Sequence, residues 1–129
     1  AVATATEWAW PTTSNEISTV FGYQSSSGKM SDHINIKGEE GDEIFAAVGG
    51  QVIESGMDRE YGNYVVIESD NNIKIIYGHL EDVSITVNDP VKAGERIGTI
   101  GRSGTATGYC LSFAVFANNV AVDPMSYYE

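Results

Sequence analysis

The sequence predicts an all-β protein, a single-domain barrel-sandwich hybrid or β-sandwich of short antiparallel strands. Fourteen glycines and seven tyrosines in 129 residues favour many short strands joined by tight turns. Two stretches have the pattern of a β-hairpin, an apolar strand on each side of an Asn-containing turn. No window of a dozen residues repeats its apolar positions with the 3.6-residue period of an amphipathic helix.

The first predicted hairpin pairs residues 64–69 with residues 73–77 across the turn Asp70-Asn71-Asn72. The second pairs residues 111–116 with residues 120–122 across a turn that contains two asparagines. It ends at Asp123-Pro124, because proline has no N–H to donate to a strand ladder.

Two further segments, residues 41–52 and 89–98, share a weaker pattern. Each places a polar turn before a short apolar strand and a glycine corner. This pattern is typical of barrel-sandwich hybrids, in which strands cross over sharply and glycine adopts the corner conformation. The two segments are too loosely alike to count as a repeat.

Composition and charge exclude several classes of function. Seven basic and eighteen acidic residues give a net charge of −11, which repels nucleic-acid phosphates and anionic lipids. We therefore expect no nucleic-acid partner. The chain contains no apolar run long enough to span a membrane. Its single cysteine excludes a disulfide framework and a zinc site made of cysteines alone.

The domain boundaries follow from composition. Residues 1–7 are mostly small and neutral and predict a linker or trimmed remnant, whereas residues 8–129 show no internal break and predict one domain. One cysteine is compatible with export. Whether a membrane anchor once preceded residue 1 stays open.

A series of short motifs runs through almost the whole chain from Trp10 onward. Trp10-Pro11 and Phe21-Gly22-Tyr23 open it, Tyr77-Gly78-His79-Leu80 lies in the middle, and Val91–Gly98 and Gly101–Gly104 follow. In this order the motifs resemble the lysostaphin/LytM-type zinc metallopeptidase domain. The resemblance implies the duplicated hybrid motif fold and an origin among cell-wall peptidoglycan endopeptidases.

The same resemblance implies that the zinc site is degenerate. The family takes two zinc ligands from a His-x-Gly-x-Asp motif and the third from the second His of His-x-His. Counting back from the turn glycine Gly41 places Asn35 and Ser31 at the first two positions, and Ser112 takes the third. Neutral hydroxyl and amide groups do not replace imidazole and carboxylate ligands, so we expect no bound zinc and no other cofactor.

His79 is the one retained member of the family's catalytic set, and Cys110 replaces the first His of His-x-His. Without a metal to activate water, His79 is expected to be inactive. An alternative is an active hydrolase with a rearranged site of His33, His79 and Cys110, dependent on either a metal or a cysteine thiolate. An isolated cysteine is more often a small buried apolar residue.

His33 stands where the family has glycine. If residues 31–35 form one strand, Ser31, His33 and Asn35 share a face, and the imidazole projects into the former zinc volume. It would then either plug that volume or form a new site with His79. We expect at least one of these two imidazoles to stay neutral and to bond to a hydroxyl such as Ser112 or Ser31.

His33 and Tyr109 are the residues that we expect to line the old substrate groove. The other tyrosines and both tryptophans are expected mostly to close the ends of a small β domain.

The resulting hypothesis is a non-catalytic, extracytoplasmic domain that binds a protein partner or a peptidoglycan glycopeptide in that groove, in cell-wall, division or sporulation processes. Degenerate relatives act in this way, as activators of division amidases or as part of a sporulation channel. A carrier domain of the barrel-sandwich type is a third hypothesis, and the intact Tyr77–Leu80 motif argues against it.

Overall fold

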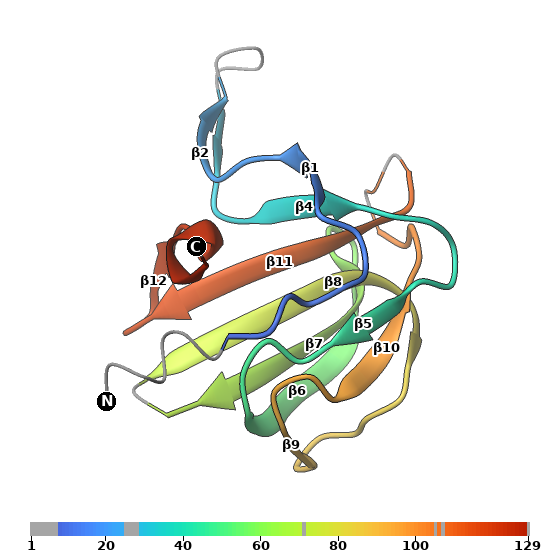
Figure 1. Cartoon of the computed structure of the whole chain (residues 1–129), viewed down its shortest axis with the longest axis vertical. Helices are drawn as coiled ribbons and strands as arrows, with labels where there is room; N and C mark the ends of the chain where they lie inside the picture. Colours follow the sequence, from blue (N-terminus) through green and yellow to red (C-terminus); the bar gives the residue numbers. More distant parts are fainter. Residues whose placement is uncertain (1–7, 25–28, 71, 105, 107, 129) are drawn as a thin grey trace.

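The chain is described by a computed structural model that covers residues 8–24, 29–70, 72–104, 106 and 108–128. The expected linker, residues 1–7, lies outside the described residues. Strands dominate what is described, and the one helical element is a short 3-10 turn (Figure 1). The all-β class predicted from the sequence is confirmed.

Twelve strands precede the 3-10 turn. They are β1 (Glu16–Thr19), β2 (Gly22–Gln24), β3 (Lys29–Ser31), β4 (Ile34–Lys37), β5 (Glu43–Phe45), β6 (Gly50–Asp58), β7 (Gly62–Ser69), β8 (Ile73–Val83), β9 (Pro90–Val91), β10 (Arg96–Ile100), β11 (Cys110–Ala117) and β12 (Val120–Val122), followed by η1 (Pro124–Tyr127). One sheet has the strand path β1-β4-β11-β8-β7-β6-β9, and β2 and β3 form a separate pair that projects from the body (Figure 1).

Both predicted hairpins are present and antiparallel. Strands β7 and β8 pair from Ser69↔Ile73 onward, and β11 pairs with β12 from Ala117↔Val120 onward. The second turn places Asn118 and Asn119 at φ 53° and 66°. Asparagine tolerates this left-handed conformation better than most residues, and a tight hairpin turn requires it at both central positions.

The two loosely similar segments pack against each other. Gly50 of β6 pairs with Val91 of β9, and Ala46 exchanges backbone hydrogen bonds with the turn before β10, accepting from Gly94 N at 2.7 Å and donating to Glu95 O at 2.8 Å. A Cβ atom at Gly50 would overlap the backbone carbonyl of Glu68, so this corner requires glycine.

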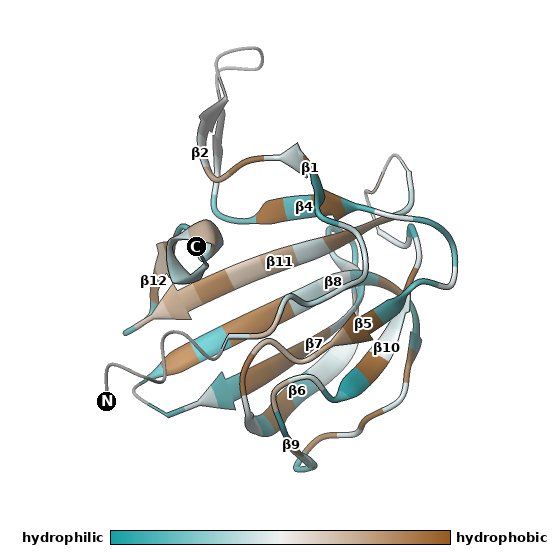
Figure 2. Cartoon of the chain, in the orientation of Figure 1, coloured by the Kyte–Doolittle hydropathy of each residue, from teal (hydrophilic) through white to brown (hydrophobic). Residues whose placement is uncertain are grey.

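The hydrophobic core lies on one face of the long strands. Its largest side chains include Tyr77 and Phe113, whose ring centroids are 5.6 Å apart, and both are fully buried. The Tyr77 hydroxyl accepts a hydrogen bond from Ala47 N at 2.9 Å, so its polar end is satisfied inside the core. Figure 2 shows apolar residues recurring along β11, β8 and β7.

Aromatic side chains hold the two ends of the described chain together. Trp8 stacks on Tyr127 with centroids 4.0 Å apart, and Trp10 meets Tyr128 edge-on at 4.9 Å. The Tyr128 hydroxyl donates to Ala9 O at 2.7 Å. We refer to Trp8, Trp10, Tyr127 and Tyr128 as the terminal clasp.

Candidate functional site

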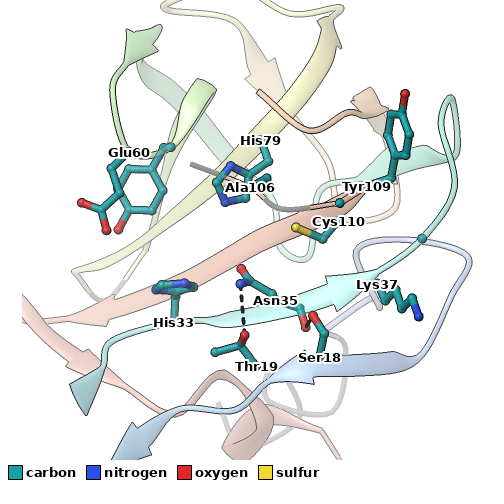
Figure 3. Close-up of a pocket in the computed structure, with 13 residues that line it drawn as sticks. Ser18, Thr19, His33, Asn35, Lys37, Glu60, His79, Ala106, Tyr109 and Cys110 are labelled. Carbon is teal, nitrogen blue, oxygen red and sulfur yellow. Dashed lines mark hydrogen bonds between the residues drawn. The ribbon is translucent and has the colours of Figure 1, made fainter. Parts of the chain in front are cut away.

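A groove of about 710 Å³ lies over the sheet at the place where β4 and β11 pair. Its floor comes from Asn35 of β4, Cys110 of β11 and His79 of β8. Tyr61, in the turn between β6 and β7, and Tyr109, just before β11, also line it (Figure 3). These four segments, far apart in sequence, therefore converge on one site.

The groove uses the face of β11 that the core does not. Leu111, Phe113 and Val115 belong to the core, and successive strand residues point to opposite faces. Cys110, which lines the groove, and Ser112 therefore lie on the groove side. Ser112 is fully buried and pairs in register with Asn35.

Two buried polar atoms have no hydrogen-bond partner, Asn35 Oδ1 on this floor and Ser112 Oγ on the strand beside it. The other end of the Asn35 amide is satisfied, because Nδ2 donates to Thr19 Oγ1 at 3.3 Å. Figure 3 shows the Asn35 oxygen pointing toward His79 and Cys110. Buried polar atoms without a hydrogen-bond partner are uncommon in folded proteins, and a functional role is one of the explanations for them.

His79 is held by its backbone and its ring. Its φ of 65° is in the left-handed region, where a histidine is strained. Its backbone N–H donates to Tyr61 O at 2.6 Å, and its backbone carbonyl accepts from Gly101 N at 3.0 Å. The ring Nδ1 lies 2.7 Å from Ser103 O. A carbonyl can only accept, so Nδ1 carries the proton.

Burial lowers the pKa of His79 below its usual value, an effect larger than the opposing influence of the hydrogen bond to Ser103. The neutral ring with its proton on Nδ1 leaves the Nε2 lone pair as an acceptor. The groove therefore holds a rigidly placed neutral imidazole.

His33 lines the groove, but it does so from a bend and not from a strand. Residues 32 and 33 form a bend between β3 and β4, so the single strand assumed for residues 31–35 does not exist. The bend is stabilised by Ser31 Oγ, which donates to His33 O at 2.8 Å. Ser31 is not among the residues that line the groove.

The hydrogen-bond partners of the two imidazoles differ from the hydroxyls that we expected. His33 Nδ1 lies 3.0 Å from Asp32 Oδ1, and His79 bonds to a backbone carbonyl. The expectation failed because the bend carries Asp32 next to the His33 ring, and a carboxylate is a stronger acceptor than a serine hydroxyl. The His33 side chain is 17% exposed.

The residues at the three ligand positions do not fit a zinc ion. Ser31 is committed to the bend, and Asn35 and Ser112 offer only neutral oxygens. Among the described residues, no group of three or more His, Cys, Asp or Glu side chains is placed to hold a metal. A structural or catalytic zinc requires three or four strong donors.

Cys110 does not have the surroundings of a catalytic nucleophile. Burial raises the pKa of its thiol, which favours the protonated, unreactive form. No hydrogen bond joins Cys110 to His79 or His33 within the described part of the chain. The geometry of a Cys–His pair is therefore not assembled.

The sequence did not point to the acidic side of the groove. Glu60 and Tyr61 line it, and Asp58 caps the same turn by accepting from Tyr61 N at 2.6 Å. Burial and then the carboxylates of Asp32, Glu60 and Asp58 raise the pKa of Tyr61 to about 12. The sequence feature that could have indicated this side is Asp58-Arg59-Glu60-Tyr61-Gly62, a polar turn that contains an aromatic residue. Only the fold brings this turn next to Asn35 and His79.

Comparison with known proteins decides the family. The family model described as Peptidase family M23 matches residues 29–124, about three quarters of the chain. The chain belongs to this family. It is 32% identical over 127 residues to outer membrane antigenic lipoprotein B of Haemophilus influenzae, and 32% identical over 121 residues to murein hydrolase activator NlpD of Escherichia coli. These alignments cover 98% and 93% of this chain but only 30% and 31% of the relatives.

Solved structures agree on the fold. A variant of the catalytic domain of the prophage-encoded M23 protein EnpA from Enterococcus faecalis is 26% identical with a TM-score of 0.80, and each chain is almost fully covered, 98% of this one and 99% of that one. The catalytic domain of lysostaphin from Staphylococcus simulans is 27% identical with a TM-score of 0.76, over 84% of this chain and 87% of that one. The lysostaphin/LytM resemblance is confirmed.

The names of the curated relatives also bear on localisation. They include an outer membrane lipoprotein and a lipoprotein of Pseudomonas aeruginosa, which agrees with the extracytoplasmic, cell-envelope localisation predicted from the sequence. Within the described residues, none of the helical segments has the length and apolar character needed to cross a membrane.

Proposed function

We propose that this chain is a non-catalytic M23 domain that binds a protein partner in its groove and so regulates the hydrolysis of cell-wall murein. The observation that carries this proposal is the set of groups at the three ligand positions. Ser31, Asn35 and Ser112 provide no charged or imidazole donor, while the groove lined by Asn35 contains a rigidly held His79.

The relatives support a regulatory role. The Escherichia coli relative is named as an activator of murein hydrolase, and an activator works on another protein rather than on the wall itself. Fold alone does not transfer function, so the argument rests on the groove. A buried floor with unsatisfied polar atoms next to two aromatic walls is suited to binding a segment of another protein.

Metal content tests the non-catalytic part. Protein purified without chelator and without a metal-affinity tag is expected to contain well under one equivalent of zinc after dialysis, measured by elemental analysis. Near-equimolar zinc would contradict the proposal. The positive control is the catalytic domain of lysostaphin prepared in the same way.

Reconstitution tests the regulatory part. Dye-labelled sacculi are incubated with the domain alone, with a murein hydrolase from the same organism, and with both. We expect dye release above background only from the pair, and Tyr109→Ala is expected to weaken the stimulation. Release by the domain alone that is lost in His79→Ala would instead support the rearranged hydrolase. The control variant Glu68→Gln changes an exposed residue of β7 that does not line the groove.

Peptidoglycan is the second candidate occupant of the groove. Tyr61 and Tyr109 both line it and offer faces on which sugars stack. Co-sedimentation with purified sacculi measures this directly. Binding that Tyr109→Ala abolishes, with no stimulation of any hydrolase, would favour a wall-binding role over a regulatory one.

A further inference from the structure

The floor of the groove presents a buried acceptor that no donor of the described residues satisfies. His79 Nδ1 donates its N–H to Ser103 O, so Nε2 is left with a lone pair that can accept a hydrogen bond. Asn35 Oδ1 points into the same space and has no donor, and Ser112 Oγ beside it has no partner either. Ser112 is fully buried, so its unmade hydrogen bond is not compensated by bulk water.

One end of the groove is also negatively charged. Glu60 lines it, and Asp32 and Asp58 lie close enough to raise the pKa of the half-buried Tyr61 hydroxyl together with Glu60. Three carboxylates around one aromatic wall give this end a negative potential, which the net charge of −11 reinforces.

The opposite end carries the positive charges. Lys37 lines the groove there and pairs with Glu16 at 3.7 Å (Figure 3). The Arg102 guanidinium lies over the Tyr109 ring, 5.2 Å from its centroid. The groove is therefore polarised along its length, from Glu60 and Tyr61 at one end to Lys37 and Tyr109 at the other.

We propose that the groove receives a lysine or arginine side chain of the protein partner, with its cationic head between the Glu60 end and the floor formed by Asn35 and His79. The head would supply the donor that Asn35 Oδ1 lacks, would donate to the acceptor Nε2 of His79 and would meet the carboxylates of Asp32 and Glu60. This inference rests on the proposed function, because it specifies the chemistry of the partner in the same groove. A neutral segment would leave the carboxylates without a counter-charge, and an acidic segment would be repelled by them.

A metal cation is a poor occupant of this floor because it would meet too few strong ligands. An ammonium or guanidinium group needs only hydrogen-bond acceptors and nearby negative charge, and both are present. The favourable contacts are spread over neutral and charged acceptors, so we expect recognition to weaken with salt but to persist.

The probe is the peptide acetyl-Gly-Gly-Lys-Gly-Gly-amide, compared with versions that carry norleucine or glutamate in place of lysine. The chain contains only two histidines, so the Cε1–H region of a carbon-proton correlation spectrum shows two histidine signals, and His33→Ala assigns them. We expect the lysine peptide to shift the His79 signal saturably, with a Kd at least about tenfold lower than that of the norleucine peptide.

Variants test the charged end. Glu60→Gln and Asp32→Asn are each expected to raise the Kd of the lysine peptide by about 3- to 10-fold, because each removes one carboxylate near the cationic head. Glu68→Gln, which removes the same charge at an exposed position outside the groove, is the matched control and should leave the Kd unchanged. Equal effects of all three would mean that only the overall charge attracts the peptide and would overturn the inference.

Two further results would overturn the inference without touching the proposed function. The first is equal binding of the lysine and norleucine peptides while Tyr109→Ala still weakens hydrolase stimulation. The second is a disaccharide-tetrapeptide from murein that binds more tightly than the lysine peptide and is weakened by Glu60→Gln, which would assign the acceptor floor to a cell-wall amine.

Discussion

The two faces of strand β11 differ in whether their buried side chains are satisfied by their surroundings. On one face Leu111, Phe113 and Val115 are fully buried in the core, and on the other Ser112 is equally buried but without a hydrogen-bond partner. Burial is the same, but it stabilises the three apolar side chains and not Ser112, because burying a polar group without a partner costs free energy. Ser112, the ligand position on this strand, belongs to the second face, and Asn35 of β4 pairs with it. They could change identity without removing the packing that holds the fold.

Phe113→Ala is the largest test of the core face. It removes a fully buried ring that packs on Tyr77, and we expect the free energy of unfolding to fall by about 3–5 kcal/mol, measured by urea denaturation. Phe116→Ala, the same change at a half-buried position three residues along the strand, should cost clearly less. Equal losses would mean that the two positions do not differ in packing.

Two substitutions of His79 test whether its backbone is strained. His79→Ala and His79→Gly both remove the bond to Ser103 O, but only glycine adopts φ near 65° without strain. We expect the alanine variant to lose about 1–3 kcal/mol. The glycine variant should be about 1 kcal/mol more stable than the alanine variant. Thermal and urea unfolding of the pair decide this, and a less stable glycine variant would contradict the role of strain.

The ionisation of His79 predicts a pH dependence of stability. Burial lowers its pKa in the folded state, so the unfolded chain binds the proton more tightly. Stability from the neutral ring is present above the unfolded pKa of about 6.5 and is lost as the pH falls through that value toward the folded pKa. We expect the free energy of unfolding to decrease below pH 7, and less steeply in His79→Asn. Equal slopes in the two proteins would remove His79 as the cause.

Ser112→Ala is expected to change the free energy of unfolding least, in contrast to Phe113→Ala. The hydroxyl has no partner, so its removal relieves an unpaired buried group. We expect stability to stay level or rise by up to about 1 kcal/mol, where removal of a bonded hydroxyl would lower it. A loss above about 1 kcal/mol in urea denaturation would show that the hydroxyl is bonded in solution.

The sequence predicted the core face better than the groove face. The alternation around Leu111 and Phe113 is a local signal with a period of two, and it survives in any strand with one buried side. The asparagine turn at Asn118 and Asn119 is equally local. Both hairpins were therefore found, the second with nearly the right limits, whereas β8 continues to Val83, beyond the predicted end at Tyr77.

The groove depends on contacts that no local pattern encodes. The bend at Asp32 and His33 replaced the assumed strand because Ser31 satisfies the backbone of the turn. Tyr61 lies 26 residues beyond Asn35 in the sequence and still lines the same groove. It fits beside β8 because residue 78 is glycine, and a Cβ atom there would lie 3.0 Å from the Tyr61 ring. The family motif supplied His79, but its hydrogen bond to Ser103 came only from the fold.

The terminal clasp has a consequence for circular permutation of the chain. Trp8 and Tyr127 are in ring contact, so the described ends of the polypeptide are already neighbours in space. A short glycine linker that joins the two ends would close the backbone into a ring with little added loop entropy. New ends opened at the exposed turn around Asn88 would then leave every strand whole, and the order of the sequence would change while the architecture stayed the same.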